Sequence, residues 1–258
     1  MGELIYLDTF VRLILLKTIM SGHSKWATTK RQKGVTDAKR ANLFTKLSKG
    51  ITVAAKEGGG VPEMNFKLKL AVDKAKAANM PKDNIERAIK KGTGEGGDGT
   101  IIEELIYEGF GPGGVAVIVK TLTDNKNRTA SSMKHLFNKH GGNLGAPGSV
   151  SWMFEDKGII RVTNVAKREE IELVAIEASA EDIISEGDSL IIYTAPTDIS
   201  TVEEALKKNG AEIEYAETEK VAKDRMTIDE GTTTRLEKFF EALDEDEDVD
   251  DYYSNTNV

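Results

Sequence analysis

The fold of this 258-residue chain is decided by the stretch from Gly158 to Thr218, which reads GIIRVTNVAKREEIELVAIEASAEDIISEGDSLIIYTAPTDISTVEEALKKNGAEIEYAET. Runs of β-branched residues predict strands, and apolar residues spaced three or four apart predict helices. The pattern predicts strand, helix, strand, strand, helix and strand, over residues 158–163, 168–179, 181–185, 189–195, 199–209 and 212–218. This βαββαβ order is typical of the ferredoxin-like arrangement. We therefore expect a ferredoxin-like α/β domain over residues 157–220.

A second α/β domain is expected on both sides of the first. A glycine-rich turn, Gly109 to Gly114, joins two predicted strands, and a helix capped by Asp124 or Asn125 follows. The predicted elements are strands at 101–107, 115–122 and 150–154, with the helix ending at His140. This block lacks a final helix and strand, and the tail supplies both, near 232–243 and 249–253. We expect a discontinuous domain of residues 98–156 plus 221–258, into which the ferredoxin-like domain is inserted.

The region before these domains predicts helices. Its polar segment from Ser21 to Gly34 has no apolar periodicity and is interpreted as an extended arm. Helices are expected at 37–57, 65–78 and 81–92, followed by a glycine-rich linker over 92–99. A basic helical domain therefore covers residues 20–94. The fold class is an α+β multidomain protein, with an N-terminal helical bundle followed by two α/β domains, at least one of them ferredoxin-like.

Residues 1–19 are treated as an extension. Their apolar run, Leu13 to Leu16, is too short for a bilayer span of ~20 residues. Glu3 and Asp8 occupy positions where a signal peptide carries positive charge. Two interpretations stay open, an additional amphipathic helix and a start codon assigned too early with Met20 as the initiator. We favour the second, and we expect a cytoplasmic protein without a membrane partner.

Charge is distributed unevenly along the chain. The formal net charge is −8, yet residues 21–94 hold 17 Lys and Arg against 6 Asp and Glu. The remaining residues hold 18 basic and 37 acidic side chains. Such asymmetry is typical of a basic module that binds a polyanion beside acidic domains that do not. The alternative is a lysine-rich helical surface kept for solubility.

The predicted nucleic-acid contacts lie in the arm and on the first helix. Lysine and arginine neutralise phosphates, and an indole ring stacks on a base. The candidates are Lys25, Trp26, Lys30, Arg31, Lys33, Lys39, Arg40, Lys46 and Lys49. For Trp26 the alternative is that the ring anchors the arm to the helical bundle. A second candidate, for RNA contact, is the glycine-rich loop with Gly141, Gly142, Asn143 and Gly145, since glycine permits close backbone approach. Its alternative is an ordinary helix-to-strand connection.

Several kinds of site are excluded or disfavoured. The chain has no cysteine, which excludes disulfides and thiolate chemistry. Gly109, Gly111 and Gly114 fit a dinucleotide fingerprint, but a strand follows them where the fingerprint requires a helix. The carboxylates over 244–251 lack the pattern of a calcium loop and are interpreted as a solvated acidic segment. We expect no enzymatic activity, no metal, no cofactor and no small-molecule substrate.

Long ordered motifs give the chain a family resemblance. They are Met20–Trp26, Lys33-Gly34, Asp37–Arg40, Asn79–Ile85, Tyr107–Gly114, Leu122–Thr129, Gly141–Gly145 and Tyr193–Pro196. From Met20 to Val258 the sequence resembles the YebC/PmpR family. The resemblance implies three domains, one helical and two α/β, and no enzymatic activity. Members are described as DNA-binding transcriptional regulators. Others, including the mitochondrial translational activator of cytochrome c oxidase, act in translation, and bacterial relatives are linked to relief of ribosome stalling.

Two functional hypotheses follow from charge and resemblance together. The first is a cytoplasmic DNA-binding regulator of transcription, whose basic module binds the duplex backbone. The second is a ribosome-associated translation factor, whose arm lies on ribosomal RNA and whose partner is the ribosome. Both are non-enzymatic regulators of gene expression that bind nucleic acid. No recognisable helix-turn-helix or zinc module accompanies the basic residues, so the sequence predicts affinity for phosphates without predicting base specificity.

Overall fold

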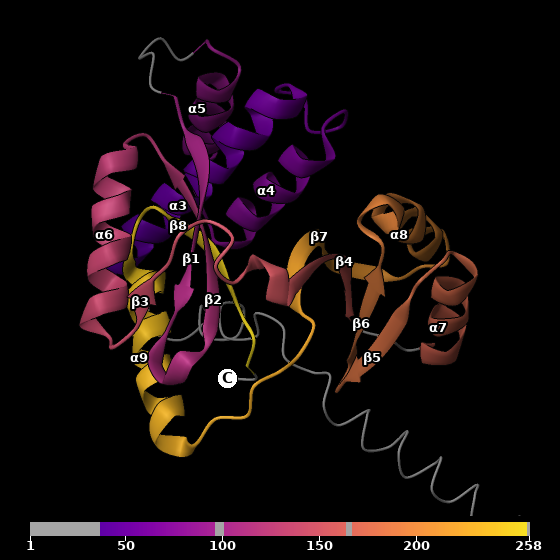
Figure 1. The fold of residues 1–258 in the computed structure, drawn as a ribbon. Coiled ribbons are helices and arrows are strands. Elements are labelled where there is room, and N and C mark those ends of the chain that lie inside the picture. The colour runs from indigo at the N-terminus through magenta and orange to yellow at the C-terminus, as the bar shows by residue number, and fades with distance from the viewer. Residues whose placement is uncertain (1–36, 96–100, 164–166, 257–258) are drawn as a thin grey trace, which may run out of the picture. The chain divides into compact units, whose positions relative to one another are not determined.

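The computed structural model describes residues 37–95, 101–163 and 167–256. These residues form seven α-helices and two antiparallel sheets, which confirms the α+β fold class (Figure 1). They divide into two compact units, one of residues 154–223 and the other of residues 37–153 with 224–256. The three-domain division expected from the sequence stays a prediction. The extension over 1–19 and the arm over 21–34 lie outside the described residues.

The first unit is ferredoxin-like. Its elements are β4 (Phe154–Thr163), α7 (Arg168–Glu177), β5 (Asp182–Glu186), β6 (Ser189–Thr194), the short 3-10 helix η4 (Pro196–Asp198), α8 (Ile199–Lys208) and β7 (Glu212–Ala222). The strand order is β5-β6-β4-β7, with every neighbouring pair antiparallel. Both helices pack on the sheet through a core that includes Ile160, Ile192 and Leu206. This topology confirms the βαββαβ prediction.

The start of β4 differs from the prediction. The sequence predicted separate strands at 150–154 and 158–163, whereas the structure has a 3-10 turn, η3 (Ser151–Met153), and one strand from Phe154 to Thr163. The strand continues through Gly158 because β7 extends to Ala222 and pairs with β4 along its whole length. A Cβ atom on Gly158 would collide with Thr194 and Ile199. This glycine therefore permits close packing within the strand.

The second unit contains the other sheet. Its elements are β1 (Glu103–Phe110), the 3-10 turn η2 (Pro112–Gly114), β2 (Ala116–Thr123), α6 (Lys126–Lys139), β3 (Asn143–Leu144), α9 (Glu230–Glu245) and β8 (Val249–Ser254). The strand order is β3-β1-β2-β8, and all neighbours are antiparallel. The segment between Gly109 and Gly114 is therefore a hairpin turn, as predicted, and Gly113 adopts a φ of 74° that favours glycine.

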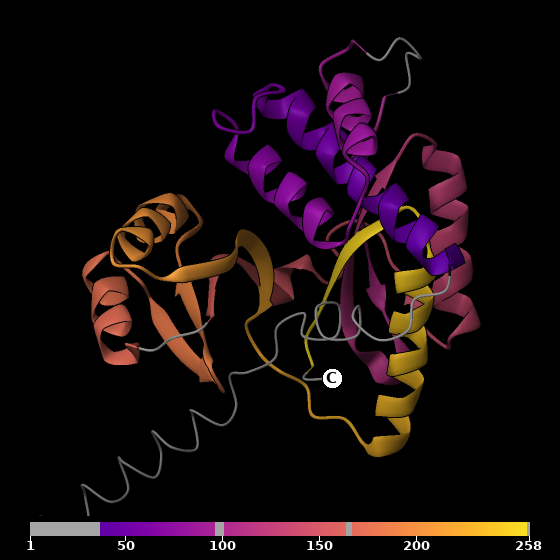
Figure 2. The ribbon, with the colours of Figure 1, turned by 180° about the vertical axis from the view of Figure 1, so that it is seen from behind.

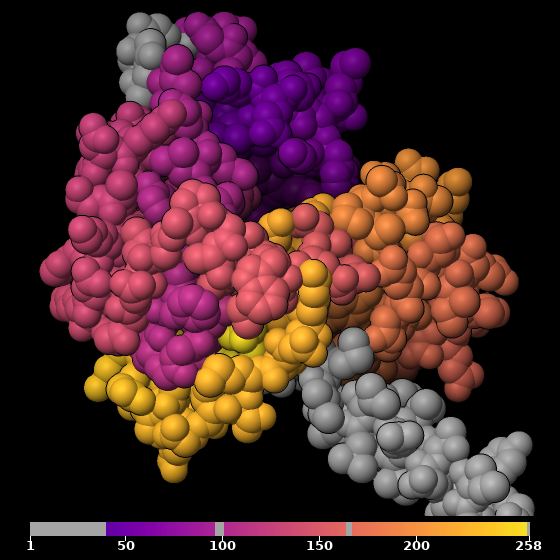
Figure 3. Space-filling view, in the orientation of Figure 1, coloured from indigo at the N-terminus to yellow at the C-terminus, as the bar shows by residue number. Residues whose placement is uncertain are grey.

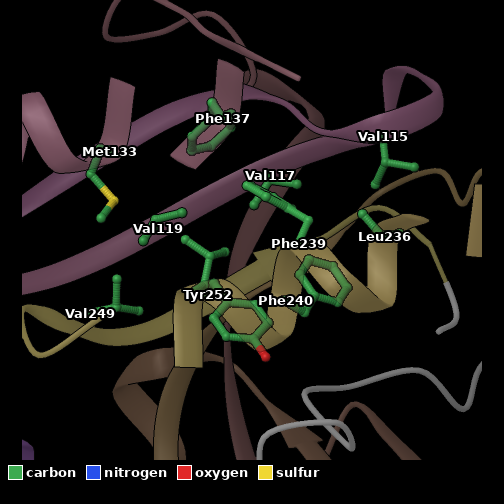
Figure 4. Packing of buried hydrophobic residues seen from close by; sticks show 11 residues of the cluster. Val115, Val117, Val119, Met133, Phe137, Leu236, Phe239, Phe240, Val249 and Tyr252 are labelled. Atoms are coloured by element: carbon green, nitrogen blue, oxygen red, sulfur yellow. The ribbon is translucent and has the colours of Figure 1, made fainter. Parts of the chain in front are cut away.

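Helices α6 and α9 share a core with β2 and β8 (Figure 4). Phe137 of α6 meets Phe239 of α9 edge to face, with ring centroids 4.9 Å apart. Phe240 stacks on Tyr252 of β8, also at 4.9 Å. Such aromatic pairs contribute about 0.5–1.5 kcal/mol beyond the area they bury. The C-terminal helix and strand are thus integral to this sheet, although more than 100 residues separate β8 from its neighbour β2.

Three helices precede the sheet in the same unit. They are α3 (Asp37–Gly58), α4 (Phe66–Ala77) and α5 (Lys82–Gly92). Pro81 comes directly before α5, and the Asn65 side chain caps α4 by accepting from the Leu68 N–H. Ile51, Leu68 and Ile85 are buried in a common core, one from each helix. This packing turns the remaining faces of the helices outward, and most of their basic residues lie on those faces.

Candidate nucleic-acid interface

The structure describes only part of the predicted interface. Lys25, Trp26, Lys30, Arg31 and Lys33 lie outside the described residues. Lys39 is in the first turn of α3, but its side chain is outside them as well. Arg40 is exposed on α3, whereas Lys46 and Lys49 are only partly exposed. The structure therefore shows the contacts of these last two lysines.

Lys46 and Lys49 contact the C-terminal end of α9. Lys46 Nζ donates to the Asp244 carbonyl at 2.7 Å, and Lys49 Nζ donates to the Glu247 carbonyl at 2.9 Å. Asn42, one turn earlier on α3, donates to the Glu245 carbonyl at 2.6 Å. The last carbonyls of a helix have no partner within the helix and form the negative end of its dipole. Asn42 and Lys46 satisfy two such carbonyls, and Lys49 binds a carbonyl just beyond the helix. The N-terminal part of α3 lies beside this end of α9 (Figure 2).

Asp248, just beyond α9, completes this junction. Its carboxylate accepts from Lys49 Nζ at 2.6 Å, from Arg128 Nη2 at 2.8 Å and from Thr129 Oγ1 at 2.8 Å. Only 3% of its side chain is exposed. Burial alone raises the pKa of Asp248, but the hydrogen bonds from Lys49, Thr129 and Arg128 together outweigh burial and lower that pKa below its usual value. We call Asn42, Lys46, Lys49, Arg128 and Asp248 the α3–α9 junction.

This finding corrects the interpretation of the acidic tail. The segment over 244–251 was expected to be solvated, yet Asp248 is buried and paired with two cations. The carbonyls of neighbouring residues are bonded to α3 as well. One carboxylate of the run, Asp248, enters the interior because Lys49 and Arg128 from two helices compensate its charge, whereas Glu245 and Glu247 stay exposed. Contact of Lys46 and Lys49 with nucleic acid stays a prediction, and any such contact competes with the junction.

Other basic residues of the helical part are turned to solvent. Three exposed lysines form ion pairs, Lys67 with Glu57, Lys76 with Asp73 and Lys82 with Glu86. Within the part of the chain that the structure describes, a further set is exposed and has no ion-pair partner: Arg40, Lys56, Lys69, Arg87 and Lys90. We call these five residues the exposed cation set. Part of the surface of the three N-terminal helices, coloured indigo to purple, is visible in the upper half of Figure 3.

Four members of this set were not among the predicted contacts. The density of lysines in the arm directed the prediction to residues 25–49, and Lys56, Lys69, Arg87 and Lys90 lie beyond it. A signal was present in the third helix, where Arg87 and Lys90 are three residues apart and therefore on one face. Ile85 and Ala88, which are buried, identify the opposite face. Applying the periodicity used for the core to the charges of α5 would have found this pair.

The glycine-rich loop after α6 is held by Glu108 of β1. The carboxylate of Glu108 accepts from the backbone N–H groups of Gly148, Val150 and Ser151, at 2.8, 2.9 and 2.8 Å. Burial raises the pKa of Glu108, but these hydrogen bonds lower it more strongly, so the pKa lies below its usual value. The loop is therefore anchored by a charged group inside the protein.

Packing inside the protein explains why two positions of this loop are glycine. A Cβ on Gly142 would lie 2.5 Å from the Phe110 carbonyl, and one on Gly145 would collide with Ser149. Gly141 has a φ of 78° with open space around it, and Asn143 is exposed in β3. Close packing thus accounts for Gly142 and Gly145 without a ligand. Contact of Gly141, Gly142, Asn143 and Gly145 with RNA stays a prediction.

Two kinds of feature are absent from the described residues. Within residues 37–95, 101–163 and 167–256, no group of three or more His, Asp or Glu residues is arranged to hold a metal ion. In the same ranges no helix combines the length and the apolar character that crossing a bilayer requires.

Comparison with known sequences identifies the family. The model of the TACO1/YebC protein N-terminal domain matches residues 24–95, and the model of the TACO1/YebC second and third domain matches residues 102–256. The chain belongs to the TACO1/YebC family. The resemblance inferred from the motifs is thereby confirmed. The boundary between the two matches falls at the glycine-rich segment that precedes β1, and the second match spans both sheets.

Relatives of this TACO1/YebC protein are similar over nearly their whole length. A protein of Treponema denticola is 53% identical over 240 residues, which cover 93% of this chain and 97% of the relative. One of Herpetosiphon aurantiacus is 48% identical over 241 residues, 93% of this chain and 95% of the relative. Both are named "probable transcriptional regulatory protein". The crystal structure of a conserved hypothetical protein from Aquifex aeolicus is 47% identical, with a TM-score of 0.79, and the match covers 90% of this chain and 96% of that one.

Proposed function

We propose that this TACO1/YebC protein is a DNA-binding regulator of transcription that acts without catalysis, in the cytoplasm. The observation that carries the proposal is the exposed cation set, on a helical part that holds 13 basic and 7 acidic residues over 37–95. Unpaired, solvated cations on helices can bind phosphates without first breaking an internal ion pair. The names of the relatives support a role in transcription.

The proposed DNA contacts come from two parts of the chain. Arg40, Lys56, Lys69, Arg87 and Lys90 bind the phosphate backbone from the helical part. The arm with Lys25, Trp26, Lys30, Arg31 and Lys33, together with Lys39, adds further contacts along the same strand. Phosphate contacts position a protein on a duplex and contribute most of its salt-dependent affinity, whereas base contacts specify sequence. In this scheme Lys46 and Lys49 serve the α3–α9 junction and hold α3 against the rest of its unit.

A second candidate is a ribosome-associated translation factor that binds ribosomal RNA. The observation that favours it is the acidity of the ferredoxin-like part, which holds 7 basic and 15 acidic residues over 157–220. Such a domain is repelled by any polyanion, so the protein would bind by its basic part alone. The loop with Gly141, Gly142, Asn143 and Gly145 would then approach RNA. Sedimentation of cell lysate separates the two candidates, because a ribosome-bound factor migrates with ribosomes and is released by nuclease.

The direct test compares two double variants that each remove two positive charges from one exposed helix. Arg87→Ala with Lys90→Ala changes the exposed cation set, and Lys134→Ala with Lys139→Ala changes the exposed surface of α6. Affinity for a short DNA duplex is measured by fluorescence anisotropy at several salt concentrations. The logarithm of the affinity falls linearly with the logarithm of the salt concentration, and each lost phosphate contact makes this line less steep by ~0.9 on duplex DNA. We expect a reduction by about two contacts in the α5 variant and no change in the α6 variant.

Equal slopes in the wild type and the α5 variant would contradict the proposal, because the α5 cations would then be only a solvated surface. Equal losses in both variants would contradict it as well, since affinity would then depend on total charge. Repeating the titration with a ribosomal RNA fragment compares the two candidate partners. Tighter binding to RNA, with the same response to the α5 variant, would support the translation factor.

A further inference from the structure

The loop between α3 and α4 is built as a fixed structure. Asn65 is 6% exposed, and its amide Nδ2 donates to the Ala54 carbonyl at 2.7 Å and to the Gly59 carbonyl at 2.8 Å. Its Oδ1 accepts from the Leu68 N–H at 3.1 Å, which caps α4. One side chain therefore ties the end of α3, the loop and the start of α4 together. The loop lies at the end of the α3–α4 pair, at the upper right of Figure 1.

Two closely packed glycines and a turn also fix the conformation of this loop. A Cβ on Gly58 would lie 2.6 Å from the Asn65 side chain, and one on Gly60 would lie 2.8 Å from Thr93 beyond α5. At the tip, the Met64 N–H donates to the Val61 carbonyl at 3.0 Å, which closes a turn with Pro62 at its second position. Proline favours that position because its fixed φ fits the turn. The tip is thus held on both sides and closed by a turn.

The side chains that this fixed tip presents are apolar. Met64 is 85% exposed and Val61 is 51% exposed, and Phe66 at the start of α4 is 36% exposed. Met64 has the largest exposed fraction among the large hydrophobic residues that the structure describes. Clusters of exposed apolar side chains often mark binding surfaces, whereas single exposed ones do not. A rigid loop that displays them loses little conformational entropy when it binds.

Cations predominate around the apolar tip, although the exposed Glu63 lies in the tip itself and Glu57 pairs with Lys67. Gly60 approaches Ile89 and Thr93, which places the loop beside the last turn of α5 with Lys90. Gly92 in turn lies against the backbone of Lys56 at the end of α3. Lys67 and Lys69 follow the tip directly on α4 and are exposed. Lys56, Lys69 and Lys90 belong to the exposed cation set, so the tip lies within the surface proposed to bind phosphates. Charge complementarity therefore favours a nucleic acid as the occupant.

We propose that Met64 and Val61 form an apolar wedge that inserts between base pairs of a DNA duplex while the neighbouring cations bind its phosphates. The proposal rests on the DNA-binding function and adds a contact with the bases to it. Phenylalanine, methionine, proline and branched aliphatic side chains partly unstack a base step when they insert from the minor groove. Unpaired RNA bases instead stack on aromatic rings, and Phe66 is the least exposed of the three apolar residues. Duplex DNA is therefore the favoured occupant.

The test measures base unstacking and phosphate binding separately. A DNA duplex with one flexible TA step carries 2-aminopurine at that step, because its fluorescence rises when the base is unstacked. We expect the wild-type protein to raise this fluorescence and Met64→Ala to lose most of the rise, with an unchanged salt slope. Met64→Lys should bind at least as tightly as the wild type, because it adds a cation, and still fail to unstack the step. Met226→Ala, which changes a partly exposed methionine distant in sequence, is the matched control.

The outcomes separate the wedge from the proposed function. Salt-dependent binding with no rise in fluorescence, or an equal rise in Met64→Ala, would overturn the wedge and leave DNA binding intact. Absence of salt-dependent binding by the wild type would overturn both. A fluorescence response to an unpaired RNA loop, without one to the duplex, would show that the tip binds RNA bases and would overturn the assignment to DNA. Because Met64 is almost fully exposed, its variants should unfold at the wild-type temperature.

Discussion

The lysines of α3 and the cations of α5 follow similar sequence patterns, but their side chains have different partners in the structure. Lys46 and Lys49 lie on the polar face of an amphipathic helix, as do Arg87 and Lys90. Lys46 and Lys49 bind the carbonyls and the carboxylate at the end of α9. Arg87 and Lys90 are exposed and have no ion-pair partner in the described part of the chain. The first pair supports the fold of the unit, and the second is available for a ligand.

The difference shows what helical periodicity can and cannot indicate. A helix separates its apolar residues from its charged ones, and this separation identified the buried faces of α3 and α5 but not that of α4, where Leu68, Val72 and Ala75 are buried. It does not indicate whether the charged face meets solvent or another part of the same chain. Asp248 lies 199 residues from Lys49, and no local pattern relates the two. Variants of the two cation pairs, measured side by side, test this difference.

The largest effect is expected from Asp248→Ala. The change removes a buried carboxylate and leaves Lys49 and Arg128 without their shared partner. Breaking a buried ion pair on one side typically costs about 3–5 kcal/mol of unfolding free energy. Urea denaturation measures the loss, and Glu247→Ala is the control, because Glu247 is exposed and only its backbone carbonyl contributes to the junction. A loss below 1 kcal/mol for Asp248→Ala would mean that the junction is peripheral to stability.

A smaller effect should separate Lys49→Met from Lys90→Met. Lys49→Met removes donors from the Asp248 carboxylate and the Glu247 carbonyl and should cost about 1–3 kcal/mol. Lys90→Met changes an exposed side chain and should stay within about 0.5 kcal/mol of the wild type. On duplex DNA the order should reverse, with Lys90→Met reducing the salt slope by ~0.9 and Lys49→Met leaving it unchanged. A slope that falls equally in both variants would show that the junction lysine also binds phosphate.

The smallest effect is the acid dependence of stability. The pKa of Asp248 is lower in the folded protein than in the unfolded chain, where aspartate titrates near 3.9. Its contribution is therefore complete above that value and is lost as the pH falls through the lower folded pKa. The loss is modest because a protonated carboxyl still accepts hydrogen bonds. Urea midpoints between pH 7 and pH 3 should fall less steeply in Asp248→Asn than in the wild type, and parallel curves would contradict the assignment.

Much of the fold followed from the sequence, with identifiable exceptions. The strand–helix order of the ferredoxin-like part was predicted because β-branched runs and amphipathic helices alternate there with clear turns. The boundary at residues 150–158 was predicted wrongly, because only the long pairing with β7 shows that residues 154–157 belong to the strand that was predicted to begin at Gly158. For the candidate site, the sequence indicated a basic helical part. It could not distinguish Lys46 and Lys49 from Lys56 or Lys90.

The alternation of helices and strands, the charge asymmetry and the family could be predicted from the sequence, because each depends on residues that are close in the chain or on ordered motifs. Which cations stay exposed and which carboxylate is buried became clear only in the folded chain. The same holds for the glycines before α4, which form a fixed loop that holds Met64 outward. The physical reason is the same in each case. Burial and pairing depend on groups from distant segments, such as Asp248 beside Lys49 or Thr93 beside Gly60, and those distances exist only after the chain has folded.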